Sequence, residues 1–136
     1  MTKVYFSSVS DNWNTPLSFY RKLDQEFRFD FDPCPLEHDF DGLSIEWGQR
    51  NFVNPPYSEW QIWVEKGYHE SRKGKLVVFL LASRTDTKVF HDYIIPFADE
   101  IRFIRGRLNF IGPLGTARAA PFPSMIVVFN KHEVKQ

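Results

Sequence analysis

Residues 54–57, Asn54-Pro55-Pro56-Tyr57, restrict the fold of this chain more than any other segment. Two adjacent prolines lack backbone N–H donors and have fixed φ angles, so the strand predicted at residues 51–53 cannot continue through them. Asn54 precedes a proline, which favours an extended conformation. The chain therefore leaves the strand along a stiff path that presents an amide, carbonyl groups and an aromatic ring. Such a segment can bind a planar group that carries an NH2, although Asn, Pro and Ser are also ordinary residues of a strand-to-helix turn.

Helical and strand-like patterns alternate along the rest of the sequence. Thr15 fits the N-cap of a first helix and Pro16 its first position. Ser58 and Gln61 fit a capping box at the start of a second helix, which should reach about residue 72. A third helix is predicted over residues 86–95, and residues 105–123 read as a loop. The predicted strands are 27–32, 43–47, 51–53, 75–82, 100–104 and 125–129.

This alternation predicts an α/β fold with a mostly parallel sheet and right-handed crossovers. In such sheets, ligands bind beyond the carboxyl ends of the strands. Asp32-Pro33 and Asn54-Pro55 each follow a predicted strand. We therefore expect these two segments to lie at the same edge of the sheet, beside one cleft.

Length and composition favour a single domain over residues 1–136, with flexible ends at 1–11 and 131–136. No apolar run approaches the length of a membrane span, and the N-terminus lacks the apolar core of a signal peptide. Cys34 is the only cysteine, which excludes an internal disulfide, and the four histidines lack metal-ligand spacing. We expect a cytoplasmic protein with no membrane partner and no metal.

The net charge is zero, but the two halves of the chain differ. Residues 1–70 hold 6 Lys and Arg against 12 Asp and Glu, whereas residues 71–136 hold 11 against 5. A basic C-terminal half can contact phosphate groups, although it can equally be an ordinary solvated surface.

Six segments of the chain form a recognisable set: Trp13-x-Thr15-Pro16, Phe31-Asp32-Pro33-Cys34-Pro35, Trp47, Val53-Asn54-Pro55-Pro56-Tyr57-Ser58, Gly106-Arg107-Leu108-x-Phe110 and Pro121-Phe122-Pro123-Ser124. Together they resemble the phage-type DNA N6-adenine methyltransferases, a Dam-like family. The resemblance covers roughly residues 12–129, and its flanking segments favour the DNA enzymes over other amino-group methyltransferases. It implies a compact, Rossmann-like sheet that uses S-adenosylmethionine as methyl donor.

The chemistry of such an enzyme suits residues 54–57, which are the expected catalytic segment. An exocyclic amino group is a poor nucleophile because its lone pair is delocalised into the ring. The side-chain oxygen of Asn54 and the carbonyl of Pro55 can accept its hydrogens and stabilise the charge that develops during attack. Pro56 stiffens the turn, and Tyr57 can stack on an adenine flipped out of the duplex.

The resemblance also implies a cofactor pocket. Asp32 would lie near the amino group of the methionine part, and the helix start at Thr15 and Pro16 near its carboxylate. Asp41 would contact a ribose hydroxyl. Thr15 and Pro16 also suit a plain helix cap, and Asp41 a solvated loop. The full predicted set is Trp13, Thr15, Pro16, Asp32, Pro33 and Asp41.

Basic residues after the later strands are candidates for contacts to DNA phosphates or bases, although arginine is common on loops in general. They follow the predicted strands at 75–82 and 100–104, so they should lie at the same edge as the catalytic segment. The predicted DNA-binding residues are Arg84, Lys88, Arg105, Arg107 and Arg118.

Three features depart from the wider methyltransferase class. Asp-Pro-Cys-Pro stands where a Gly-rich turn is usual. Only 22 positions separate Asp32 from Asn54, so the cofactor-side half of the sheet is shortened. A separate target-recognition domain does not fit in 136 residues, so selectivity would come from loops.

These departures leave other functions open beside DNA adenine methylation. The chain can methylate cytosine N4, RNA adenine or a protein glutamine, or it can be a DNA-binding relative that has lost catalysis. A role in phage restriction-modification is one setting for the methylation.

Overall fold

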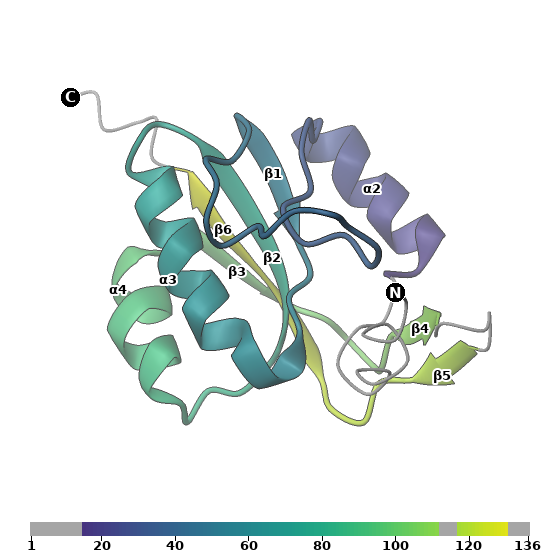
Figure 1. Ribbon diagram of the computed structural model, residues 1–136. Coiled ribbons are helices and arrows are strands. Elements are labelled where there is room, and N and C mark those ends of the chain that lie inside the picture. Colours follow the sequence, from purple (N-terminus) through teal and green to yellow (C-terminus); the bar gives the residue numbers. More distant parts are fainter. Residues whose placement is uncertain (1–14, 112–116, 131–136) are drawn as a thin grey trace.

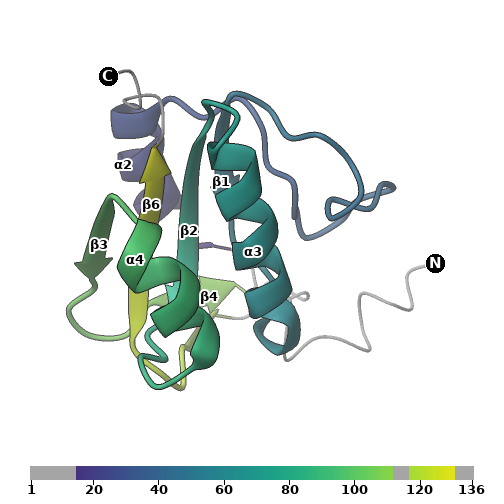
Figure 2. The same ribbon diagram turned by 90° about the vertical axis from the view of Figure 1, so that its left-hand side faces the viewer.

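The computed structural model describes residues 15–111 and 117–130. It is a mixed α/β structure of three layers, with a sheet between α2 on one face and α3 and α4 on the other (Figures 1 and 2). The elements are α2 (Leu17–Phe27), β1 (Arg50–Val53), η1 (Tyr57–Glu59), α3 (Trp60–Ser71), β2 (Leu76–Ala82), η2 (Phe90–Ile94), α4 (Ile95–Phe97), β3 (Glu100–Phe103), β4 (Asn109–Ile111), β5 (Ala117–Ala119) and β6 (Ser124–Asn130).

The main sheet has the strand order β1-β2-β6-β3. β1 and β2 are parallel, with Val53 opposite Phe79. β6 runs antiparallel to both of its neighbours, so the prediction of a mostly parallel sheet is wrong for two of the three strand pairs. An apolar strand has the same composition in either direction, and the reversal arises from the connection between β3 and β6. That connection, predicted as a loop, carries the antiparallel pair β4–β5.

Two predicted strands are absent. Residues 27–32 do not form a strand with one buried face, because Phe27 ends α2 and Arg28 turns the chain with a φ of 57°. Phe29 then packs on the α2 side of the sheet, whereas Phe31 packs on the α3 side. Residues 43–47 form a loop, held by a hydrogen bond of 2.7 Å from the Trp47 indole N–H to a backbone carbonyl.

The helix starts fall one residue beyond the predicted caps. The N-cap of α2 is Pro16 and that of α3 is Glu59, and neither of these two residues makes a side-chain capping hydrogen bond. Ser58 instead lies inside η1, the short 3-10 turn that precedes α3. The predicted third helix is present in part, as the π-helical η2 and the short α4.

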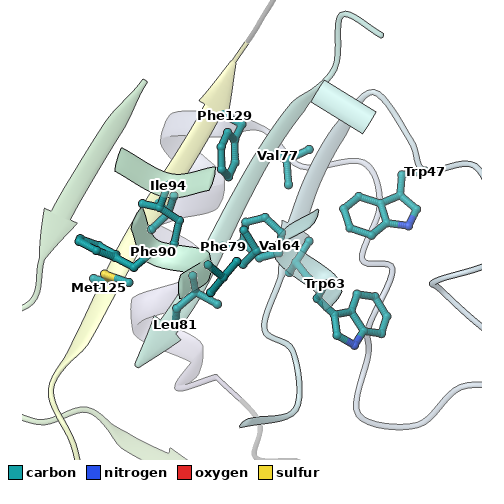
Figure 3. Packing of buried hydrophobic residues seen from close by; sticks show 13 residues of the cluster. Trp47, Trp63, Val64, Val77, Phe79, Leu81, Phe90, Ile94, Met125 and Phe129 are labelled. Atoms are coloured by element: carbon teal, nitrogen blue, oxygen red, sulfur yellow. The ribbon is translucent and has the colours of Figure 1, made fainter. Parts of the chain in front are cut away.

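The sheet buries an apolar cluster on each face. On the α3 and α4 face, Phe79, Met125 and Phe129 meet Val64 and Ile94, all at most 1% exposed (Figure 3). The other face is covered by the apolar side of α2 together with residues of the β4–β5 segment. β2 and β6 supply residues to both clusters, so they form the centre of the molecule.

Two glycines allow α3 to join β2 at close range. A Cβ atom on Gly67 would lie 2.4 Å from the buried Phe79 ring, so a larger residue there would displace either that ring or the helix. Gly74 has a φ of +91° in the turn between α3 and β2. This conformation strains residues that have a side chain.

A buried ion pair closes the amino-end edge of the sheet. Lys75 Nζ lies 2.6 Å from Glu70 Oε1, and both residues are at most 3% exposed. Lys75 also donates to the Trp47 carbonyl at 2.9 Å and to Glu46 at 3.0 Å. Glu70 accepts the Trp47 backbone N–H and pairs with Lys66 and Lys73. All three N–H donors of Lys75 are therefore used.

The charge of Glu70 contributes to stability. Burial alone would raise the pKa of its carboxyl, but hydrogen bonds from three lysines and from the Trp47 backbone lower the pKa to about 2. Because the folded pKa lies below the ordinary value of 4.5, the contribution is present above about pH 4.5 and is lost as the pH falls toward 2.

We predict that Glu70→Gln lowers the free energy of unfolding at pH 7 by about 3–5 kcal/mol, because Lys75 loses its buried partner. Between pH 4.5 and 2, the stability of the variant should also fall less than that of the parent protein. Urea denaturation across pH measures both effects. Asp92→Asn removes the exposed partner of Lys88 and should cost about 0–1 kcal/mol. Equal losses in the two variants would contradict a dominant role for the buried pair.

Candidate active site

The structure brings the two polar segments of the predicted site to one edge of the sheet. Phe31 forms a parallel bridge with Asn51 of β1, and its carbonyl accepts the Phe52 N–H at 3.1 Å. Asp32 follows the bridged residue, and Asn54 follows the end of β1. Because the two segments run in the same direction, Asp32 and Asn54 both lie at the carboxyl-end edge of the sheet.

Asn54 is tied to the start of the chain's first helix. Its side-chain Nδ2 donates to Thr15 Oγ1 at 3.0 Å. Thr15, predicted as a helix cap, thus orients the Asn54 amide instead. Pro16 accepts the Tyr20 N–H at 2.9 Å, which begins the hydrogen bonding of α2. The first turn of α2 therefore lies beside the Asn54 turn.

Tyr57 packs against an aromatic ring that the sequence did not pair with it. The Tyr57 and Phe122 centroids are 4.6 Å apart with the rings at 88°, and the Arg84 guanidinium lies 5.7 Å from the Phe122 centroid. A cavity of about 10 Å³ lies between Pro55, Tyr57 and Trp60 on one side and the end of β2 on the other. Phe122 lies in a segment that carries the family resemblance, but no periodicity links it to residue 57.

Asp32 is a partly buried carboxyl. One of its oxygens accepts the Cys34 backbone N–H at 2.9 Å. Burial raises its pKa to about 6, although that hydrogen bond and the nearby His38 act in the opposite direction. Burial and the charges of Asp32 and Glu59 raise the pKa of the Cys34 thiol to about 12. Cys34 is therefore protonated at neutral pH.

The loop after Asp32 folds back over it. The Phe40 ring stacks on Phe31 with a centroid distance of 6.0 Å. A Cβ atom on Gly42 would lie 2.0 Å from the carbonyl of Pro33, which is buried. Asp41 between them is exposed, and its Oδ1 accepts the Leu43 N–H at 3.0 Å. Asp41 thus shapes its own turn. Trp13 lies outside the described residues.

The predicted DNA-binding residues fall into separate places. Arg84 lies at the Tyr57 cavity. Arg118 is opposite Phe110 in the β4–β5 pair, and Arg107 precedes that pair and donates to the Ala120 carbonyl at 3.3 Å. Lys88 is exposed and pairs with Asp92 at 3.6 Å. All five, including Arg105, are exposed.

The described ranges, 15–111 and 117–130, contain no group of three His, Cys, Asp or Glu residues that could hold a metal ion. Within the same ranges, no helix has the length and apolar character needed to cross a membrane.

The chain matches the family described as DNA N-6-adenine-methyltransferase (Dam) over residues 3–135, nearly its whole length. It therefore belongs to this family, which makes it a methyltransferase of the DNA adenine class. The mixed α/β sheet is compatible with an α/β methyltransferase. A comparison with individual curated proteins gave no match.

We predict that Asp32 destabilises the free protein as it ionises. Its folded pKa lies above the ordinary value of 3.8, so its stability contribution is highest below that pH and declines as the pH rises to about 6. Asp32→Asn should therefore raise the free energy of unfolding at pH 7 by about 1–3 kcal/mol relative to the parent. Thermal unfolding between pH 4 and 7 tests this, with Asp92→Asn as control. If the stability of the parent and that of Asp32→Asn change with pH in the same way, the assigned effect of Asp32 is contradicted.

Proposed function

We propose that this protein transfers a methyl group from S-adenosylmethionine to N6 of adenine in DNA, with the adenine flipped into a site built from residues 54–57. The observation that carries the proposal is the family match over residues 3–135 in a chain whose Asn54 turn and Asp32 turn share one sheet edge. The sheet would then be a compact, Rossmann-like methyltransferase sheet with a shortened cofactor side. We place the reaction in the cytoplasm, where cellular or phage DNA is accessible.

The Asn54 turn suits an amino-group nucleophile. Thr15 Oγ1 accepts a hydrogen bond from the Asn54 side-chain NH2 and so fixes the orientation of the amide. The amide oxygen and the Pro55 carbonyl would accept hydrogen bonds from N6 and stabilise the positive charge that develops on the nitrogen. Pro56 has an extended backbone, with φ −60° and ψ 142°, and passes directly into the turn that carries Tyr57. The acceptors therefore have little freedom to reorganise.

Tyr57 and Phe122 would form the aromatic part of the base site. Their edge-to-face contact supports the Tyr57 ring from one side. The cavity beside Tyr57 holds no more than about one water, so an adenine has to displace side chains to enter. Arg84, above Phe122, would move together with that wall. Base entry would thus be coupled to rearrangement of the segment around Phe122.

The residues around Asp32 fit the cofactor that the family implies. A partly buried carboxyl with a raised pKa would be stabilised by a cation, and the methionine part carries an ammonium group. The first-turn amides of α2, after Pro16, would face its carboxylate. The exposed Asp41 would contact the ribose. When bound, the cofactor supplies an electrophilic methyl group on a sulfonium.

The decisive assay is methyl transfer from labelled S-adenosylmethionine to unmethylated DNA, followed by digestion and mass identification of the nucleoside. N6-methyladenine supports the proposal. N4-methylcytosine, or label in RNA or a protein glutamine, would redirect it to another amino group. Cofactor binding without transfer to any of these would indicate a relative that has lost catalysis.

We predict that Asn54→Ala lowers the rate of transfer at saturating cofactor by about 10²–10³-fold, because the principal acceptor for the amino group is removed. Tyr57→Ala should weaken transfer by a similar factor, whereas Tyr57→Phe keeps the stacking ring and should retain much more activity. Circular dichroism and thermal unfolding verify the fold of each variant. Full activity in both alanine variants would refute the assigned site.

We also predict that cofactor affinity, measured by calorimetry, falls as the pH drops below about 6. Protonation of Asp32 removes the charge that would face the ammonium group. Asp32→Asn should bind about tenfold more weakly at pH 7.5 and lose most of this pH dependence. An unchanged affinity in Asp32→Asn would remove Asp32 from the cofactor pocket.

A further inference from the structure

A groove outside residues 54–57 separates α2 from the segment that leads into β4; Figure 1 shows α2 at the upper right of the molecule and β4 below it. Its volume is about 360 Å³, far larger than the cavity beside Tyr57. We call it the α2–β4 groove. It is lined by Pro16, Ser18, Phe19 and Lys22 of one wall and Arg107, Leu108 and Asn109 of the other.

Each wall of the groove contributes one exposed cation. Lys22 comes from α2, and Arg107 comes from the β4 side. Within residues 15–111 and 117–130, no carboxylate forms a salt bridge with either side chain. Arg107 donates one N–H to the Ala120 carbonyl at 3.3 Å and has further N–H donors. The groove therefore carries two positive charges without a neutralising partner in the described part of the chain.

The other lining groups suit a sugar-phosphate chain. The Ser18 hydroxyl and the Asn109 amide are exposed hydrogen-bonding groups. Phe19 and Leu108 are partly buried and add apolar surface to the lining. Phosphodiesters need cations and neutral donors, whereas the faces of sugars and bases accept apolar contact.

The groove begins where the candidate active site ends. Pro16 lines it, and the preceding residue, Thr15, accepts the hydrogen bond from Asn54. Lys22 lies five residues after Leu17, the first residue of α2, which is about 8 Å along the helix axis, and the non-helical residues 15 and 16 bring its separation from Thr15 to about 10 Å or more. One DNA strand rises about 3.4 Å per nucleotide, so this distance corresponds to about three nucleotides.

We propose that the α2–β4 groove binds the phosphodiester backbone of the substrate DNA within about three nucleotides of the target adenine. Lys22 and Arg107 contact the phosphates from opposite walls, and Ser18 and Asn109 add neutral donors. Lys22 acts as a positioning residue. This inference rests on the proposed function, because it takes DNA as the substrate.

The test compares DNA affinity by fluorescence anisotropy with a short labelled duplex over a series of salt concentrations. Lys22→Gln and Arg107→Gln should each weaken binding about five- to tenfold and reduce the slope of log K against log salt by about 1. The double variant should reduce the slope by about 2. Lys22→Arg and Arg107→Lys keep the charge and should restore most of the slope.

Arg72→Gln is the matched control, because this exposed arginine caps the C-terminal end of α3 on the other face of the sheet. Thermal unfolding verifies that each variant is folded. In steady-state methylation, Lys22→Gln should raise the KM for DNA by a larger factor than it lowers kcat, as expected for a residue that positions the substrate without touching the reacting atoms.

Parent and groove variants with the same affinity and salt slope would overturn the groove assignment while leaving the proposed methyl transfer intact. A dependence on Lys22 and Arg107 seen with an RNA duplex but not with DNA would overturn it in favour of RNA. If the parent protein neither binds nor methylates DNA, the groove assignment and the proposed function both fail.

Discussion

The buried ion pair between Lys75 and Glu70 anchors a long loop that contains no helix or strand. Residues 32–49 contain no helix or strand, yet they connect the Phe31 bridge to β1. The backbone of Trp47 contacts both members of the pair, so the end of this loop is fixed to α3 and β2 at once. A charged pair removed from water is stabilising only when its hydrogen bonds are complete, and here the lysine has three acceptors.

The same loop is held at its middle by close packing. The Trp47 ring stacks on Trp63 of α3 at 6.1 Å, and its indole N–H bonds the Gly42 carbonyl. Gly42 in turn lies against the Pro33 carbonyl. Asp32 is therefore positioned through a chain of contacts that starts at the opposite edge of the sheet. In the proposed function, this loop would stand in place of the strands and helices that a longer methyltransferase has on the cofactor side.

The candidate site divides into a rigid part and a part that would have to move for a base to enter. Asn54 is held by the proline pair, by β1 and by the Thr15 hydroxyl, which suits a group that must present an acceptor in one direction. Tyr57 and Phe122 instead fill the space that a base would need. Phe122 belongs to the connection between β3 and β6, which also carries Arg107 and the β4–β5 pair. In the proposed function, DNA contacts on that connection would thus act on the same segment that carries Phe122 beside the proposed base site.

The sequence alone predicted the turn at residues 54–57, the family, β1, β2 and β6, because each depends on neighbouring residues: a proline pair after a strand, or an unbroken apolar run. It failed at residues 27–32, where Phe27, Phe29 and Phe31 alternate as in a strand but are divided between a helix and both faces of the sheet. The direction of β6, the contact of Phe122 with Tyr57, the use of Thr15 by Asn54 and the groove containing Lys22 were decided only by the tertiary structure. Each joins residues far apart in the chain, and their pairing depends on how the layers pack rather than on any local pattern.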